Sequence, residues 1–148
     1  MKCFMYCEWI DEIRVRKSMP DCVVIDTVTL HDHKLVFTTY VEDEDKTERG
    51  SGCHMVPSAG DHVLGLLVEL NDEEVKIAET LSRVEQGRYT PQTYRVVDTK
   101  GNEHDSVAYV IKHPLGPSAP SDEYRDHMVV GGRNAGFPDD YVAMIEGL

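Results

Sequence analysis

Over most of the first 112 residues, apolar and β-branched side chains occur in short runs separated by polar turns, a pattern typical of β-strands. Polar, Gly-containing stretches such as 58–61 and 100–102 have turn chemistry, and 42–51 is predicted to be an exposed loop. The predicted strands are Lys2–Tyr6, Cys22–Leu30, Lys34–Val41, Gly52–Val56, His62–Leu70, Thr93–Asp98 and Ser106–Lys112.

Helical periodicity occurs at four places. One helix begins at Asn71, a good N-cap, and is expected to stop at Gly87. Its predicted stripe is Val75, Ala78, Leu81, Ser82 and Glu85. The other predicted helices are Trp9–Lys17, Asp122–Val130 and Asp139–Glu146, with a turn over Gly131–Gly136 between the last two. Strands with helices inserted late predict an α+β fold, a small mixed β-barrel with flanking helices, in a single domain over residues 1–148.

Charge excludes some partners. The chain carries 27 acidic against 15 basic residues, a net charge of −12. Such a surface repels phosphate backbones and anionic lipid, so we expect neither nucleic acid nor membrane as a partner. The acidic runs 41–45 and 71–74 are interpreted as a solvated loop and a helix start.

The four cysteines are Cys3, Cys7, Cys22 and Cys53, and their spacing does not indicate a dense disulfide framework. The apolar run at the N-terminus ends at Glu8, too early for a signal sequence or a membrane span. These two features predict reduced cysteines and a cytoplasmic location. A homodimer stays open as the oligomeric state.

Metal and nucleophile motifs are weak. Histidines and a cysteine at 31, 33, 53, 54 and 62 are potential ligands, but neither C-x-x-C nor H-E-x-x-H occurs, so no metal is predicted. Cys7 is a weak candidate nucleophile, because the adjacent Glu8 disfavours a thiolate. Gly131–Gly136 lacks the preceding strand of a dinucleotide-binding motif.

Two stretches carry a resemblance to a known family. The first comprises Pro120-Ser121-Asp122-Glu123-Tyr124 and the segment Gly131–Tyr141, which reads G-G-R-N-A-G-F-P-D-D-Y. The second runs from Gly52 to Glu85 and ends in Leu81-Ser82-Arg83-Val84-Glu85-Gln86-Gly87. Together they are similar to the γ-glutamylcyclotransferase-like (AIG2-like) family, whose helix carries Leu-Asp-x-x-Glu-Gly at this point.

The resemblance implies an enzyme that cyclises a γ-glutamyl amide, releasing 5-oxoproline and a free amine. The substrate's own α-amine attacks the γ-carbonyl, so no cofactor is needed and the tethered attack has a high effective molarity. Glu85 matches the family's glutamate and is the predicted general acid/base. Tyr124 and Tyr89 are predicted to bind the glutamyl group through their phenols.

The family's substrate loop, Tyr-Gly-Ser-Asn-Leu, corresponds here to Tyr6, Cys7, Glu8, Trp9 and Ile10, which are therefore the predicted substrate-binding residues. The carboxylate of Glu8 would repel a docking carboxylate and attract an amine. We therefore expect a γ-glutamyl amide or related amine other than glutathione as the small-molecule partner. The altered loop leaves two alternatives, changed small-amide chemistry on the same fold and a non-catalytic relative that binds an amine or peptide.

Overall fold

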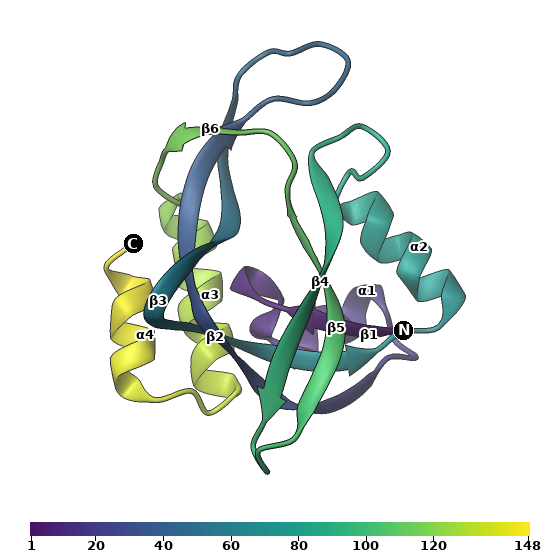
Figure 1. Ribbon diagram of the computed structural model, residues 1–148, viewed down its shortest axis with the longest axis vertical. Helices are drawn as coiled ribbons and strands as arrows, with labels where there is room; N and C mark the ends of the chain where they lie inside the picture. The colour runs from purple at the N-terminus through teal and green to yellow at the C-terminus, as the bar shows by residue number, and fades with distance from the viewer.

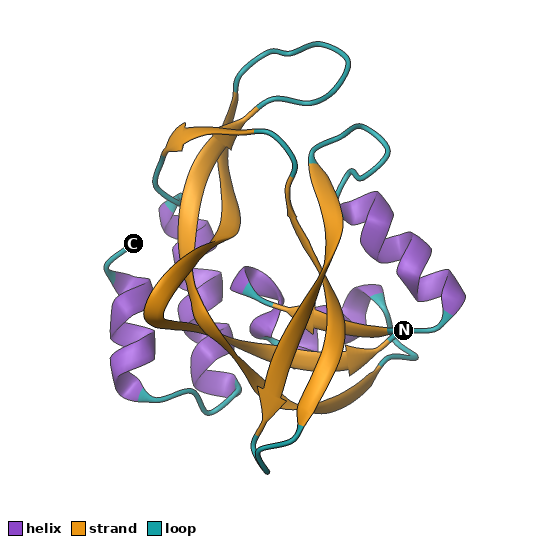
Figure 2. Cartoon of the chain, viewed as in Figure 1, coloured by secondary structure: helices purple, strands orange, loops and turns teal.

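At the centre of the computed structural model, which describes residues 1–148, a five-stranded sheet closes into a barrel. The strands follow the order β3-β1-β5-β4-β2, and β2 pairs with β3 to complete the ring (Figure 2). Their bounds are β1 Lys2–Met5, β2 Val23–Tyr40, β3 Arg49–Glu69, β4 Tyr89–Asp98 and β5 Glu103–Ile111. A short sixth strand, β6 (Pro114–Pro117), pairs with the end of β2. The predicted α+β barrel is confirmed.

The first strand occupies a central position in this ring. It pairs antiparallel with β3, where Phe4 lies opposite Leu67, and parallel with β5, where Cys3 lies opposite Val107. The N-terminal amine also donates to the carbonyl oxygen of Leu70 at 2.8 Å. The residues that follow β1 therefore emerge at a point surrounded by other strands.

The predicted strands Cys22–Leu30 and Lys34–Val41 form one continuous strand, and so do Gly52–Val56 and His62–Leu70. The turns predicted at 31–33 and 58–61 are irregularities within β2 and β3. Between the pairs His31↔His62 and His33↔Pro57, one residue of β2 faces four of β3. Asp32 has a positive φ of 60° and accepts a hydrogen bond from the backbone N–H of Gly60 at 3.0 Å. The turn-forming residues of β2 and β3 lie opposite each other in the sheet. Both strands therefore bend at this point and continue beyond it.

Four helices flank the barrel: α1 Glu12–Ser18, α2 Asp72–Leu81, α3 Asp122–Asn134 and α4 Asp139–Glu146. Helices α3 and α4 lie next to each other on one side, and α2 lies on the opposite side (Figure 1). The bounds predicted for α4 match those observed.

The first two helices start or end away from their predicted bounds. Residues Cys7–Ile10 form a separate 3-10 turn, η1, because the Asp11 side chain accepts from the N–H of Ile13 and caps α1 after it. Asn71 caps α2 as predicted, with Glu74 completing a capping box. That helix ends at Leu81, not near Gly87.

The third helix is longer than predicted because it continues through Gly131 and Gly132. A Cβ at Gly131 would lie 3.0 Å from the Ile10 side chain and 3.1 Å from the Cβ of Asp11. These glycines therefore allow α3 to approach η1 closely. The turn predicted over Gly131–Gly136 begins only at Ala135, after the helix has ended.

Two apolar clusters hold the elements together. The larger fills the barrel and the space under α3 and α4, and Leu67, Val96, Met128 and Ile145 in it are fully buried. The smaller joins β1 and β3 to α1 and α2 and contains Val15 and the free thiols of Cys3 and Cys22.

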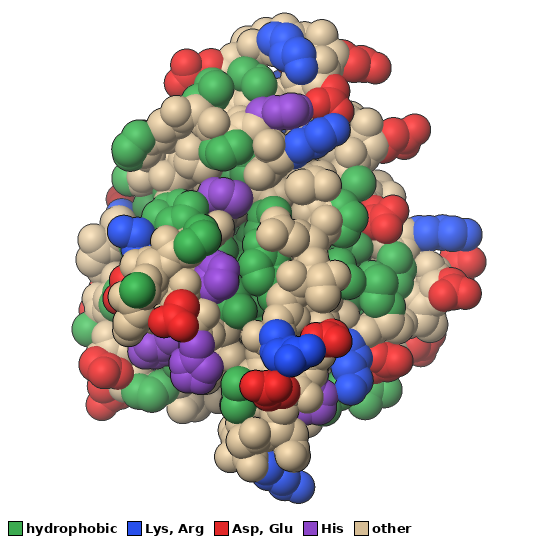
Figure 3. All heavy atoms as spheres, in the orientation of Figure 1, with side chains coloured by type: hydrophobic (Ala, Val, Ile, Leu, Met, Phe, Trp, Pro, Cys, Tyr) green, Lys and Arg blue, Asp and Glu red, His purple; other side chains and the backbone are tan.

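Acidic side chains are spread around the face shown in Figure 3 and mixed with basic ones, not gathered in one patch. No helix has the length and apolar character needed to cross a membrane.

Candidate active site

A cavity of about 330 Å³ opens where β1 ends. Its walls come from η1, the start of β3, the end of α2, the start of β4, and single side chains of β2, β5 and α3. Five tyrosines line it: Tyr6, Tyr40, Tyr89, Tyr109 and Tyr124. A cavity of this size and aromatic character suits a small-molecule ligand.

The predicted substrate loop lies at this cavity. Tyr6, Cys7, Glu8 and Trp9 all line it, whereas Ile10 does not. Ile10 is 2 % exposed and belongs to the larger core cluster, where it packs against Gly131 of α3. Its predicted role in substrate binding is therefore not supported, because its side chain anchors the loop from behind.

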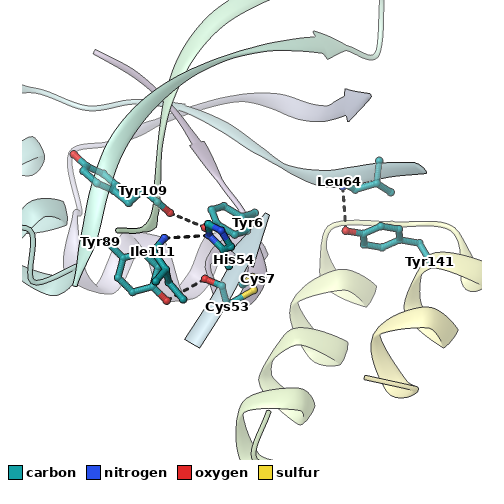
Figure 4. The surroundings of a disulfide bond; sticks show 9 residues. All are labelled: Tyr6, Cys7, Cys53, His54, Leu64, Tyr89, Tyr109, Ile111 and Tyr141. Carbon is teal, nitrogen blue, oxygen red and sulfur yellow. Dashed lines mark hydrogen bonds between the residues drawn. A yellow bond between two sulfur atoms is a disulfide. The ribbon is translucent and has the colours of Figure 1, made fainter. Parts of the chain in front are cut away.

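A disulfide crosses the cavity wall and joins Cys7 of η1 to Cys53 of β3 (Figure 4). The prediction of reduced cysteines is wrong for this pair. The two are separated by 46 residues, and only the closure of the barrel brings them together. A bonded Cys7 has no thiolate to offer, so the structure gives no support to Cys7 as a nucleophile.

Tyrosine hydroxyls tie the surrounding strands together. Tyr6 donates to the carbonyl oxygen of Tyr109 at 2.6 Å, and Tyr89 donates to that of Cys53 at 3.1 Å (Figure 4). Burial raises the pKa of Tyr6, Tyr89, Tyr109 and Tyr124 above the ordinary value. At neutral pH these side chains are protonated phenols. Tyr6 and Tyr89 use their protons on backbone carbonyl oxygens, whereas Tyr124 keeps its proton for a ligand.

The two tyrosines of the C-terminal motifs have different roles. Ser121 caps α3 by accepting from the N–H of Tyr124, which sets that ring in the first helical turn against the cavity. The Tyr124 ring packs edge-on against the Phe37 ring, with 5.6 Å between the ring centroids. Tyr141 lies away from the cavity, where its hydroxyl accepts from the backbone N–H of Leu64 (Figure 4). The first motif forms the site, and the second fastens α4 to the barrel.

Ser82 and Glu85, which were predicted to lie on one face of a continuous helix, have different surroundings at the end of α2. Ser82, the C-cap residue, lines the cavity. Glu85 is exposed on the turn that follows, outside the cavity lining and without an ion-pair or hydrogen-bond partner. The chain leaves the helical path at Arg83, whose φ is +47°, so Glu85 does not continue the inward stripe.

Glu8 is the one carboxylate that lines the cavity. Its side chain is 23 % exposed and is 3.8 Å from a guanidinium nitrogen of Arg14 and 3.9 Å from Nδ1 of His127. Neither contact is a close hydrogen bond, so the carboxylate keeps capacity to accept from a ligand.

Arg88 is the one cation that lines the cavity, and it is not among the residues predicted from the sequence. Its Nη2 donates to Glu42 at 3.0 Å, and its guanidinium carbon is 5.1 Å from the ring centroid of Tyr40. Glu42 belongs to the acidic run interpreted as a solvated loop, yet it is 3 % exposed. Only the fold shows that an acidic loop residue is buried among arginines.

The side chains weighed as metal ligands are not gathered into a cluster of three or more. Cys53 is in the disulfide, and Nδ1 of His54 accepts from the backbone N–H of Ile111 at 3.1 Å.

Comparison with known proteins identifies the family to which the chain belongs. A family model described as the AIG2-like family matches residues 62–145, more than half of the chain. The chain belongs to the AIG2-like family. That match includes α2, Arg88, Tyr89 and Tyr124 but begins after the loop at Tyr6–Trp9.

Curated relatives of this AIG2-like chain include the γ-glutamylcyclotransferases of Bos taurus and Homo sapiens. They are 24 % and 23 % identical over 128 residues, which cover 86 % of this chain and 68 % of each relative. A solved structure described as a γ-glutamyl cyclotransferase superposes with a TM-score of 0.88 at 21 % identity, covering 100 % of this chain and 87 % of that one. YkqA of Bacillus subtilis gives 0.80 at 18 % identity and covers 99 % of this chain and 53 % of that one.

Proposed function

We propose that this chain cyclises the γ-glutamyl group of a γ-glutamyl amide and releases 5-oxoproline and a free amine. Its curated relatives and a structural neighbour are named for this activity. The observation that carries the proposal is a cavity that one carboxylate, one guanidinium and several phenols line together. A γ-glutamyl group presents an ammonium, a carboxylate and a polar carbonyl, and each has a complementary group in this cavity.

The reaction needs only proton transfer. The substrate's α-nitrogen forms a bond to the γ-carbon, and the γ-amide C–N bond breaks. A carboxylate removes two protons from the α-nitrogen in turn and passes them to the leaving nitrogen, which departs as an ammonium, so atoms and charges balance. Because the nucleophile and the carbonyl belong to one molecule, the protein gains most by holding them in the attacking geometry.

We assign the proton transfers to Glu8. It lines the cavity, whereas Glu85, to which the resemblance gave this role, lies outside the lining. A general base must come within hydrogen-bonding distance of the proton that it removes. The phenol of Tyr124 is available as a donor to the γ-carbonyl oxygen as negative charge develops on it, whereas the proton of Tyr89 is already donated to the carbonyl oxygen of Cys53.

The same carboxylate argues for a substrate other than glutathione. An amide whose leaving part carries a carboxylate would bring a like charge into a small cavity beside Glu8, which is unfavourable. A leaving amine that is neutral or cationic avoids this repulsion. The proposed substrate class is therefore a γ-glutamylamine.

The test is 5-oxoproline release from γ-glutamyl-propylamine, γ-glutamyl-alanine and glutathione. We expect wild type to prefer the propylamide, Glu8→Gln to lose about 100-fold or more in rate, and Glu85→Gln to keep its rate. The two variants make the same isosteric change inside and outside the cavity. Loss of activity only in Glu85→Gln would return the role to Glu85, and fast turnover of glutathione would remove the substrate proposal. No release from any amide would overturn the reaction and favour the binding-protein alternative.

A further inference from the structure

The guanidinium of Arg88 is only partly used by the protein. Nη2 is bound to Glu42, and Nε is buried without a hydrogen-bond partner. Nη1 has no partner within the chain and is not buried. Arg88 lines the cavity, so this nitrogen has donors left for a ligand there.

Arg88 is also held in place from behind. The buried carboxylate of Glu42 is 2.8 Å from Nε of Arg49, 3.4 Å from Nη2 of Arg83 and 3.0 Å from Nη2 of Arg88. The face of the Tyr40 ring supports the same guanidinium. An arginine fixed on two sides loses little conformational freedom when it binds a ligand.

This cluster has spare positive charge. Arg49 pairs also with Asp45, so three guanidinium groups share two carboxylates. One positive charge remains uncompensated, in a chain whose net charge is −12. An anion that approaches the protein is repelled by most of its surface and attracted at this wall of the cavity.

We propose that Arg88 is the carboxylate subsite of the cavity and binds the α-carboxylate of the γ-glutamyl group through Nη1. This rests on the proposed function, which supplies the γ-glutamyl group as the ligand. Arg88 and Glu8 then receive the two charges of one zwitterion, the carboxylate and the ammonium. An amide that lacks the α-carboxylate leaves the spare charge of Arg88 unpaired and binds more weakly.

The product and its carboxylate-free analogue form a matched pair of unreactive probes. 5-Oxo-L-proline and 2-pyrrolidinone share the lactam ring and differ only by the carboxylate. Binding is measured by NMR titration of the intact protein. We expect wild type to bind 5-oxoproline about 10- to 100-fold more tightly than 2-pyrrolidinone, the range for a charged hydrogen bond.

Three variants test where this preference arises. Arg88→Gln is expected to abolish it, with 2-pyrrolidinone binding unchanged, and Arg88→Lys to retain part of it. Arg83→Gln is the matched control, because Arg83 contacts the same carboxylate of Glu42 but does not line the cavity. It should keep the preference in full. Equal binding of the two probes to wild type, or a preference that survives in Arg88→Gln, would overturn the proposal.

The subsite and the reaction can fail separately. If no amide releases 5-oxoproline but the preference depends on Arg88, the subsite stands and the reaction does not. If 5-oxoproline is released but Arg88→Gln discriminates between the probes as wild type does, the reaction stands and the subsite does not.

Discussion

The two ends of the barrel are held by different forces. Under α3 and α4 the contacts are apolar, with Met128 and Ile145 fully buried in the larger cluster. At the cavity end, ion pairs hold the loop after β2. Glu42 contacts Arg83 and Arg88 on the turn after α2 and Arg49 at the start of β3, and Asp43 contacts Lys112 and His113 after β5. Figure 1 shows that loop and that turn at the same end of the molecule. Apolar packing gives a fixed scaffold, whereas ion pairs give a wall whose strength depends on pH and salt.

The largest effect should come from the apolar end. Met128→Ala removes a fully buried side chain from α3, and we expect it to lower the free energy of unfolding by about 3 to 4 kcal/mol. Urea unfolding measures the loss. Met144→Ala is the matched control on α4, where the side chain is 38 % exposed, and it should cost about 0.5 kcal/mol or less. Equal losses in the two variants would contradict the location of the core.

The cavity end also has a covalent link, the disulfide between Cys7 of η1 and Cys53 of β3. Replacing Cys7 and Cys53 together by serine should lower stability by about 3 kcal/mol, because the unfolded chain is then no longer constrained by a loop of this length. Alkylation of the unreduced, unfolded protein should label only the two free cysteines, Cys3 and Cys22. Labelling of all four without a reductant would show that the bond does not form.

A smaller effect is expected at the polar end. Glu42→Gln leaves three arginines without their common carboxylate, and we expect a loss of about 2 kcal/mol, moderated because the arginines reach water. Desolvation raises the pKa of Glu42, but the hydrogen bond from Arg88 and the three positive charges together bring it below its ordinary value. The loss should shrink in high salt, whereas that of Met128→Ala should not. An effect of Glu42→Gln that is independent of salt would break the comparison.

The smallest effect is a dependence on acid pH. Hydrogen bonds from Lys112 and His113 lower the pKa of Asp43 from 3.8 to about 2. A carboxyl with a lowered folded-state pKa stabilises the protein above the unfolded value and loses this contribution as pH falls from about 4 to about 2. Asp43→Asn should therefore show a flatter melting temperature than wild type over that range. Asp126→Asn, at an exposed site without a partner, should follow wild type.

The fold was largely predictable because its signals are local. Helix caps such as Asn71, runs of β-branched residues and the final helix all depend on neighbouring residues, and these predictions hold. The failures come from tertiary contacts. The turn signals at 31–33 and 58–61 are real, yet cross-strand pairing converts them into bends, and the glycines at 131 and 132 serve helix packing.

The site was predictable only in part. The resemblance led to Tyr6, Tyr89 and Tyr124, which all line the cavity. Arg88 could not be found in this way, because nothing in the sequence around it shows that Glu42 is buried and holds it from 46 residues away. The position of Glu85 depends on a positive φ at Arg83, for which the sequence gives no signal.

The placement of β1 between β3 and β5 also constrains the order of folding. Its partners lie about 60 and 100 residues further along the chain, so a barrel built on it has many contacts between residues distant in sequence. Such contacts form slowly, because closing a long loop costs chain entropy before the contacts between its ends can stabilise it. During synthesis, residues 2–5 must wait for β5 to leave the ribosome before the ring can close. The cavity, whose walls join Tyr6 to Tyr109 and Tyr124, is therefore expected to form late, and a chain cut before α3 should not bind ligand.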